Sequence, residues 1–254
     1  MSLAVLYDST KCVGCRECER ACSGKWGLPY NEAIAAREVL SEHKLTTIVT
    51  RGERYARRMC MHCNQPTCVS VCPVAALQKT EAGPVVYDEK RCMGCRYCML
   101  ACPFQVPVYE WTRTQPKVKK CDMCFERLMA GKPTTCSEAC PTGATITGRR
   151  EELLHEALHR LATNPKDYWQ RIYGRREVGG ASVLMIAAAP PEELGLKANL
   201  PQHPLPLLTW QALSFVPDVV GVGSALLGGV YWITHRREEV AAAEGRKPGK
   251  DVGR

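Results

Sequence analysis

The chain has 254 residues, 45% of them hydrophobic, and a formal net charge of +8 at pH 7. This length is enough for one sizeable domain, or for two small domains and a tail. Its 16 cysteines set it apart from ordinary globular chains. Disulfide scaffolds are usually shorter and do not group their cysteines in fours with two- and three-residue gaps, so we favour cysteines that act as metal ligands.

The first residues predict a short strand that leads into cysteines. Ala4 to Asp8 reads AVLYD. The N-terminus has no charged region followed by a long apolar run, so we expect neither a signal peptide nor an N-terminal membrane anchor.

The sequence repeats itself. Residues 5–22 align with residues 85–102, and the segment CPVAALQK from Cys72 resembles CPTGATIT from Cys140. Such internal duplication predicts a chain built from repeated modules.

Two further segments follow the cysteine groups. Residues 23–59 form a connector with a basic stretch, 51–58, in which we recognise no chemistry. Residues 151–161 place apolar side chains at helical spacing behind acidic residues, which predicts an amphipathic helix. His155 and His159 lie four apart on it. That spacing can hold a metal, but we favour a solvated helix face.

The C-terminal part predicts a strand, a linker and a membrane span. Residues 182–187 form an apolar strand, and a proline-rich linker follows it. The prolines are Pro190, Pro191, Pro201, Pro204 and Pro206. Leu205 to Thr234 carries one charge, Asp218, and exceeds the about 20 residues that cross a hydrocarbon core. A buried core helix is the alternative, because Pro217 and Asp218 interrupt the run.

Features of this apolar segment favour the membrane. Aromatic residues stand near its two ends, at Trp210, Tyr231 and Trp232. Gly221, Ala225 and Gly229 form a small-residue face on which another transmembrane helix can pack closely.

All 16 cysteines fall into four quartets, and we expect every one to ligate iron. The quartets are Cys12-x2-Cys15-x2-Cys18-x3-Cys22; Cys60-x2-Cys63-x4-Cys68-x3-Cys72; Cys92-x2-Cys95-x2-Cys98-x3-Cys102; and Cys121-x2-Cys124-x11-Cys136-x3-Cys140. The first and third match the bacterial ferredoxin run, in which three close thiolates bind one 4Fe-4S cluster and the fourth ligates another. Structural zinc, the competing metal, prefers two pairs of ligands.

The exchange of fourth cysteines predicts that the quartets work in pairs. Sequential pairing joins the first quartet with the second, and nested pairing joins the first with the fourth and the second with the third. The spacing leaves both open. Four oxidised clusters add about eight negative charges, so the basic balance is expected as counter-charge for cofactors, and no nucleic-acid binding is expected.

Several segments carry a resemblance to a known family. They are CMHCNQPTCVSVCPVAAL (60–77), CMGCRYCMLACPFQVPVY (92–109), KCDMC (120–124), CSEACPTGA (136–144) and GRREELLHEA (148–157). From about Val5 to Ala188 the sequence resembles the four-cluster iron–sulfur subunits of respiratory membrane-bound oxidoreductases. These occur with formate dehydrogenases, NiFe-hydrogenases and relatives of polysulfide and dimethyl sulfoxide reductases. The resemblance implies an α+β fold of two fused bacterial ferredoxin-like modules with a single C-terminal transmembrane helix.

The resemblance also implies nested pairing and four 4Fe-4S clusters, because no third-quartet cysteine is replaced. The implied ligand sets are Cys12, Cys15, Cys18 and Cys140; Cys121, Cys124, Cys136 and Cys22; Cys60, Cys63, Cys68 and Cys102; and Cys92, Cys95, Cys98 and Cys72. By the same resemblance, the half with the first and fourth quartets faces a catalytic subunit and the other half faces the membrane.

Residues beside the thiolates receive smaller roles. His62 is expected to pack or hydrogen-bond, because four thiolates already complete each cluster. Arg16, Arg96 and Lys79 are candidates for raising a cluster potential, with solvated surface residues as the equal alternative. Prolines after the last cysteines are expected to end the cysteine helices. They are Pro73, Pro103 and Pro141.

We therefore expect four parts: residues 1–148 as a double ferredoxin-like four-cluster domain, 149–204 as helix, strand and proline-rich linker, 205–234 as the transmembrane anchor, and 235–254 as a basic cytoplasmic tail. Basic residues after the span are Arg236, Arg237, Arg246, Lys247, Lys250 and Arg254, whereas Lys197 alone precedes it. The positive-inside rule then places the cluster domain on the periplasmic or outer side of the cytoplasmic membrane. Such a domain would be exported folded, with a partner that carries the signal.

The expected function is electron transfer without catalysis. We recognise no catalytic base or nucleophile and no glycine pattern for nucleotides. Single electrons would pass through four clusters between a catalytic subunit of the formate dehydrogenase or NiFe-hydrogenase type and a quinone-reactive integral membrane subunit. The alternatives are a soluble polyferredoxin, a subunit of a related molybdopterin reductase, and an iron–sulfur enzyme, which would need an open iron or further catalytic residues.

Overall fold

The computed structural model describes residues 2–114 and 116–245. It divides into two compact units, Met1–Pro206 and Leu207–Arg254. The first unit holds most of the elements: β1 (Leu3–Asp8), η1 (Ser9–Lys11), α1 (Glu17–Trp26), β2 (Thr47–Arg51), β3 (Arg54–Arg58), α2 (Thr67–Ser70), β4 (Leu77–Lys79), β5 (Val85–Tyr87), α3 (Tyr97–Ala101), β6 (Val108–Tyr109), β7 (Val118–Lys119), α4 (Phe125–Met129), α5 (Thr135–Glu138), β8 (Thr145–Arg149), α6 (Arg150–Thr163), η2 (Glu177–Gly179) and β9 (Val183–Ile186). Two helices complete the chain, α7 (Leu205–Ser214) and α8 (Val216–Ala243).

A three-stranded sheet of order β8-β1-β9 organises the first unit. The central strand β1 pairs antiparallel with β8 and parallel with β9. Successive side chains of a strand point to opposite faces. Ala4 and Leu6 therefore pack with α6, whereas Val5 and Tyr7 pack in a core that contains Cys18, Cys60, Cys121 and Cys136. This strand separates a supporting helix from the cysteines, and the strands predicted at 4–8 and 182–187 are confirmed.

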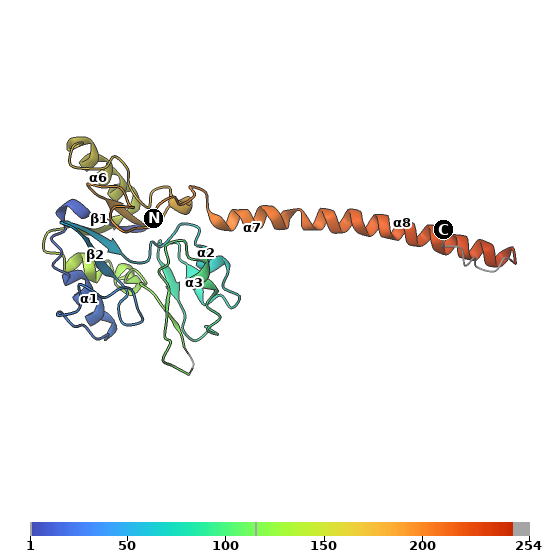
Figure 1. Ribbon diagram of the computed structural model, residues 1–254, viewed down its shortest axis with the longest axis horizontal. Helices are drawn as coiled ribbons and strands as arrows, with labels where there is room; N and C mark the ends of the chain where they lie inside the picture. The colour runs from blue at the N-terminus through green and yellow to red at the C-terminus, as the bar shows by residue number, and fades with distance from the viewer. Residues whose placement is uncertain (1, 115, 246–254) are drawn as a thin grey trace. The chain divides into compact units, whose positions relative to one another are not determined.

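The predicted amphipathic helix is also confirmed, as α6, which lies beside β1 (Figure 1). Its buried residues Leu153, Ala157 and Leu161 recur at the i, i+4, i+8 spacing of one helix face. His155 and His159 are exposed, as a solvated face requires.

The sequence duplication is visible in the backbone. Gly14 and Arg16 of the first quartet adopt left-handed conformations, with φ of 70° and 60°, and Gly94 and Arg96 of the third repeat them with 75° and 64°. A Cβ on Gly14 would lie 2.4 Å from Cε1 of Tyr55, and one on Gly94 would lie 2.9 Å from the Tyr109 hydroxyl. Each cysteine loop thus passes closely beneath a tyrosine ring.

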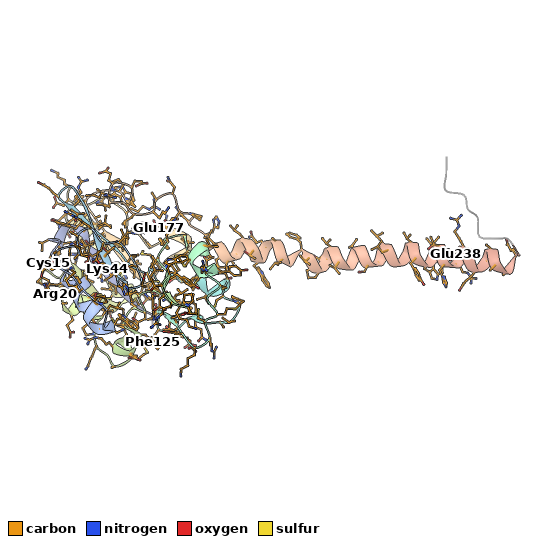
Figure 2. All side chains as sticks on the ribbon, turned by 60° about the horizontal axis from the view of Figure 1, so that its bottom comes forward. Cys15, Arg20, Lys44, Phe125, Glu177 and Glu238 are labelled. Atoms are coloured by element: carbon orange, nitrogen blue, oxygen red, sulfur yellow. The ribbon has the colours of Figure 1, made fainter. Side chains whose placement is uncertain are left out.

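The connector 23–59 forms a hairpin that sequence reasoning did not assign. Strands β2 and β3 pair antiparallel, with Ile48 opposite Arg57. Glu19 of α1 connects the hairpin to the first quartet. Its buried carboxylate accepts a hydrogen bond from Ile48 N at 2.5 Å and forms an ion pair with Lys44 at 2.7 Å. The Lys44 side chain can be located in Figure 2.

The described part of the second unit is helical as far as Ala243. Helices α7 and α8 together form the stretch Leu205–Ala243, the one among the described helices that is long and apolar enough to cross a membrane. Its large hydrophobic side chains are mostly exposed (Figure 2). Pro217 stands in the first turn of α8, where a missing N–H costs no helical hydrogen bond, so it starts a helix instead of ending one. The helix continues to Ala243, beyond the predicted end of the span at 234. Arg246, Lys247, Lys250 and Arg254, on which the predicted orientation partly rests, lie outside the described residues.

Candidate metal centres

The cysteines lie on short helices and on the loops directly before and after them. None of the 16 forms a disulfide bond. Cys18 and Cys22 belong to α1, Cys68 to α2, Cys98 to α3 and Cys136 to α5. Pro73, Pro103 and Pro141 follow the ends of α2, α3 and α5 within three residues, in keeping with their predicted role.

Four cysteines from two distant quartets line one cavity. Cys121, Cys124 and Cys136 border it from one side of the sequence, and Cys22 borders it from the other. Burial, together with the Cys136 thiolate, raises the pKa of Cys22 to about 12. In the described part of the chain no three His, Cys, Asp or Glu side chains converge as closely as the ligands of a single metal ion. The four thiols instead line a cavity, and four soft thiolates around a cavity are suited to hold an iron–sulfur core.

The second and third quartets are interleaved in the same way. Burial raises the pKa of Cys63, and the thiolates of Cys60, Cys102 and Cys68 raise it further. Helices α2 and α3 pack together at this place. The structure therefore brings Cys102 of the third quartet to three cysteines of the second.

The reciprocal group is centred on Cys98. Burial, together with the thiolates of Cys92, Cys95 and Cys72, raises its pKa to about 11. Cys72 comes from the second quartet, and its sulfur accepts a hydrogen bond from Ala76 N at 3.3 Å. Crowded thiolates repel one another, and a cationic iron core would relieve that repulsion.

The first quartet adjoins the fourth. Helix α1 packs on α5, and β1 pairs with β8. Cys15 is exposed at this end of the unit, whereas Cys18 is buried. Cys140 follows α5, and its sulfur lies 3.7 Å from the Thr142 hydroxyl. Although burial acts in the opposite direction, hydrogen bonds from Thr145 and Thr142 lower the pKa of Cys140.

The candidate tuning residues are mostly engaged elsewhere. Arg16 forms an ion pair with the buried Glu19 at 2.8 Å. Arg96 lies over the rings of Tyr109 and Trp111, at 4.7 and 4.9 Å from their centroids. These two arginines thus have local structural partners.

His62 and Lys79 support the second quartet. His62 Nδ1 accepts a hydrogen bond from Val85 N at 2.8 Å, which agrees with the expected packing role. Burial holds the pKa of His62 well below its usual range, and Lys120 and Lys79 lower it further. Lys79 Nζ donates to the His62 carbonyl at 3.1 Å. Lys79 is therefore not a solvated surface residue.

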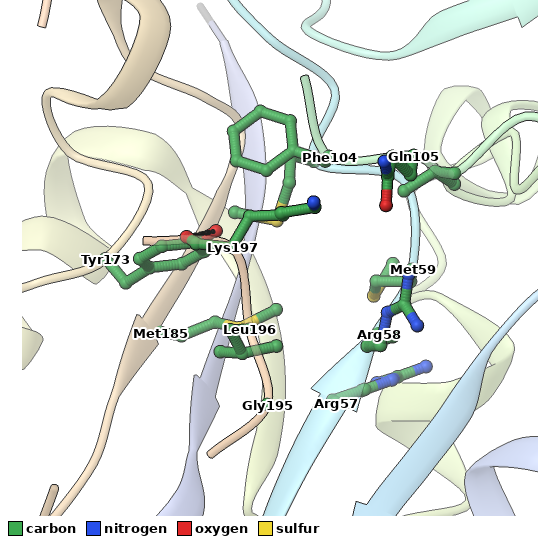
Figure 3. A pocket seen from close by; sticks show the side chains of 12 residues that line it. Arg57, Arg58, Met59, Phe104, Gln105, Tyr173, Met185, Gly195, Leu196 and Lys197 are labelled. Atoms are coloured by element: carbon green, nitrogen blue, oxygen red, sulfur yellow. Dashed lines mark hydrogen bonds between the residues drawn. The ribbon is translucent and has the colours of Figure 1, made fainter. Parts of the chain in front are cut away.

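Arg57, which sequence reasoning did not single out, is the buried cation of the first and fourth quartets. It borders the cavity of Cys22, Cys121, Cys124 and Cys136. It also borders a separate cavity of about 310 Å3, together with its neighbour Arg58 on β3 (Figure 3). Although burial acts in the opposite direction, the thiolates of Cys136 and Cys18 raise the pKa of Arg57, so it carries a permanent charge. A lone arginine in a basic stretch gives no sequence signal for such burial.

The cysteine arrangement defines an iron–sulfur protein, and the comparisons with known proteins agree. A family model described as a 4Fe-4S dicluster domain matches residues 52–150, and a second model with the same description matches residues 11–76. The two matches overlap, so they share the second quartet.

Individual relatives make the assignment more specific. The chain is 37% identical over 238 residues to the hydrogenase-2 operon protein HybA of Escherichia coli O157:H7, with 77% of this chain and 73% of HybA covered. It is 35% identical over 173 residues to a subunit of the anaerobic dimethyl sulfoxide reductase of Escherichia coli K12, with 65% and 82% covered. It is 30% identical over 221 residues to the iron–sulfur subunit of the nitrate-inducible formate dehydrogenase of the same strain, with 80% and 73% covered. The chain therefore belongs to the family of electron-transfer iron–sulfur subunits with 4Fe-4S dicluster domains.

Proposed function

We propose that this chain relays single electrons on four 4Fe-4S clusters between a catalytic subunit, of the hydrogenase or formate dehydrogenase type, and a quinone-reactive membrane subunit. The observation that carries the proposal is the cavity lined by Cys22 of the first quartet and three cysteines of the fourth. It supports the nested ligand sets, because sequential pairing would keep Cys22 with the second quartet.

The proposed sets follow one another through the first unit. Burial is the main cause that raises the pKa of Cys18, Cys121 and Cys68. A thiolate of another set adds to it in each case: Cys136 acts on Cys18, Cys60 on Cys121 and Cys98 on Cys68. Each of these pairs joins two different ligand sets. Together they support the order of first, fourth, second and third quartet along the proposed relay.

The residues of the chain would hold and shield the cofactors. When bound, a 4Fe-4S cluster accepts or donates one electron, with a potential set by charge, hydrogen bonds to sulfur and solvent exposure. Main-chain amides already point at ligand sulfurs, as Met123 N does at 3.2 Å from Cys121 Sγ. Burial of Cys121, Cys124 and Cys136 would exclude water from the inner part of the relay.

The relatives and the C-terminal helix support the proposed partners and membrane placement. The relatives are named for a hydrogenase, a formate dehydrogenase and a dimethyl sulfoxide reductase. We propose that α8 anchors the chain in the cytoplasmic membrane with its C-terminus in the cytoplasm and the cluster unit on the outer side. Arg236 and Arg237 at the end of the apolar stretch support this orientation. Nickel, molybdenum or tungsten in the co-purifying subunit would identify the substrate.

Activity measured at the two ends of the relay tests the function. In the native complex purified anaerobically in detergent, Cys95→Ser should abolish quinone reduction by the physiological donor. The same variant should retain reduction of a soluble dye by the catalytic subunit. His159→Ala, an exposed change on α6, is the matched control and should leave both activities intact.

Other outcomes would favour the rivals. Unchanged quinone reduction in Cys95→Ser would contradict the relay. Release of the native protein from membranes by salt without detergent would favour a soluble polyferredoxin.

A further inference from the structure

Arg57 is a buried cation without a carboxylate partner. Its side chain is 1% exposed at the end of β3. Nε donates to the Thr46 hydroxyl at 3.0 Å and Nη1 to the Thr145 hydroxyl at 3.1 Å. None of the ion pairs among the described residues involves Arg57. Two neutral hydroxyls do not offset the cost of removing a full charge from water.

Two half-buried arginines of this unit, in contrast, pair with carboxylates of the chain itself. Arg16 pairs with Glu19, and Arg160 pairs with Asp8 at 2.9 Å. Lys120, which also lacks an ion pair among the described residues, donates to the carbonyl of Cys121 at 2.9 Å. The guanidinium of Arg57 instead borders the cavity of Cys22, Cys121, Cys124 and Cys136. Its charge also acts on Cys18 of the first quartet.

The negative charge that balances Arg57 therefore comes from the thiolates around this cavity. A cluster with four thiolates carries about two negative charges when oxidised and one more when reduced. A fixed positive charge in a region of low dielectric constant favours the more negative state of a neighbouring group. Arg57 is placed to favour the reduced state of the two clusters nearest to it.

We propose that Arg57 is a potential-tuning residue that raises the midpoint potentials of the two clusters held by the first and fourth quartets. The inference rests on the proposed ligand sets. Reduction adds one electron, supplied by the catalytic subunit or by a titrant, and the guanidinium keeps its protons throughout. Arg57 thus acts on the ease of reduction without ligating iron.

The test is a redox titration of the detergent-purified complex followed by electron paramagnetic resonance. In Arg57→Gln the reduction equilibrium of two clusters should shift at least tenfold toward the oxidised state, which is about 59 mV more negative for a one-electron centre. The other two clusters should titrate as in the wild type. Arg57→Lys keeps a positive charge and should shift both potentials less. Arg58→Gln, on the same strand and half-buried, is the matched control and should leave all four unchanged.

A second variant keeps the arginine in place. Thr46→Asp puts a carboxylate beside Nε of Arg57, offsets the positive charge of the guanidinium and should lower the same two potentials. This variant decides the question if Arg57→Gln assembles incompletely. Full iron content with all four potentials unmoved in both variants would overturn the role of Arg57. Fewer than four clusters in the wild type would instead contradict the ligand sets on which the inference rests.

Discussion

At Gly14 the chain has almost no space beside its backbone. A Cβ there would lie 2.4 Å from the Tyr55 ring, and φ is 70°, a conformation that side chains other than glycine disfavour. Tyr55 belongs to β3, so its ring packs the hairpin against the loop between Cys12 and Cys15. The absence of a side chain at Gly14 thus allows the loop of the first quartet to pack against Tyr55.

Gly14→Ala should therefore destabilise the cluster unit by about 2 kcal/mol, through left-handed strain and overpacking. Thermal unfolding of the anaerobic protein, followed by cluster absorbance, measures the effect. Gly24→Ala is the control: Gly24 lies in α1, where an added Cβ would meet no neighbour within 4 Å, and the change should be neutral or slightly stabilising. Equal unfolding temperatures for Gly14→Ala and the wild type would show that the loop is free to adapt.

Some single residues of the candidate site could be predicted from the sequence, and others could not. Cysteine spacing predicts ligands because three close thiolates have few other uses. The burial of Arg57 has no such signal, because its Nη1 partner Thr145 lies 88 positions away in the sequence. Long-range contacts, rather than local pattern, decide whether an arginine is a solvated residue or a buried cation.

At the scale of elements, an ion pair joins the central strand to its supporting helix. Arg160 of α6 contacts the fully buried carboxylate of Asp8 on β1 at 2.9 Å, and Tyr168 donates a hydrogen bond to the same oxygen at 2.8 Å. Removing one partner of a buried pair leaves an uncompensated charge. This contact therefore fixes α6 against the sheet on the side away from the cysteines.

Arg160→Met should lower the free energy of unfolding by about 3 kcal/mol, because Asp8 would lose its counter-charge. Anaerobic denaturant titration monitors the change. Arg149→Met removes an exposed pair with Glu152 and should cost under about 1 kcal/mol. Similar losses for the two variants would mean that Asp8 does not depend on Arg160.

The predictable elements are those with local periodicity. The short apolar run in residues 4–8 and the helical repeat in 151–161 are properties of neighbouring residues, so β1 and α6 were predictable from sequence. The hairpin β2–β3 was not, because its residues share no cysteine motif and its packing is set by Glu19 and Tyr55. It nevertheless supplies Arg57, which borders the fourth-quartet cavity.

At the scale of the whole molecule, pairing of the quartets depends on contacts that spacing cannot encode. Sequential and nested pairings use the same sixteen cysteines with the same gaps. Packing of α1 on α5 and of α2 on α3 brings the first quartet to the fourth and the second to the third. The duplication in the sequence therefore predicts modules, whereas tertiary contacts determine which quartets lie together.

The four proposed 4Fe-4S clusters can be counted from the content of iron and acid-labile sulfide of the chain. The protein is purified anaerobically in detergent, and the centres of any partners are subtracted. We expect about sixteen irons and about sixteen sulfides per chain, four of each for every cluster. Half that content in fully assembled protein, or zinc in place of iron and sulfide with oxygen damage excluded, would contradict this expectation.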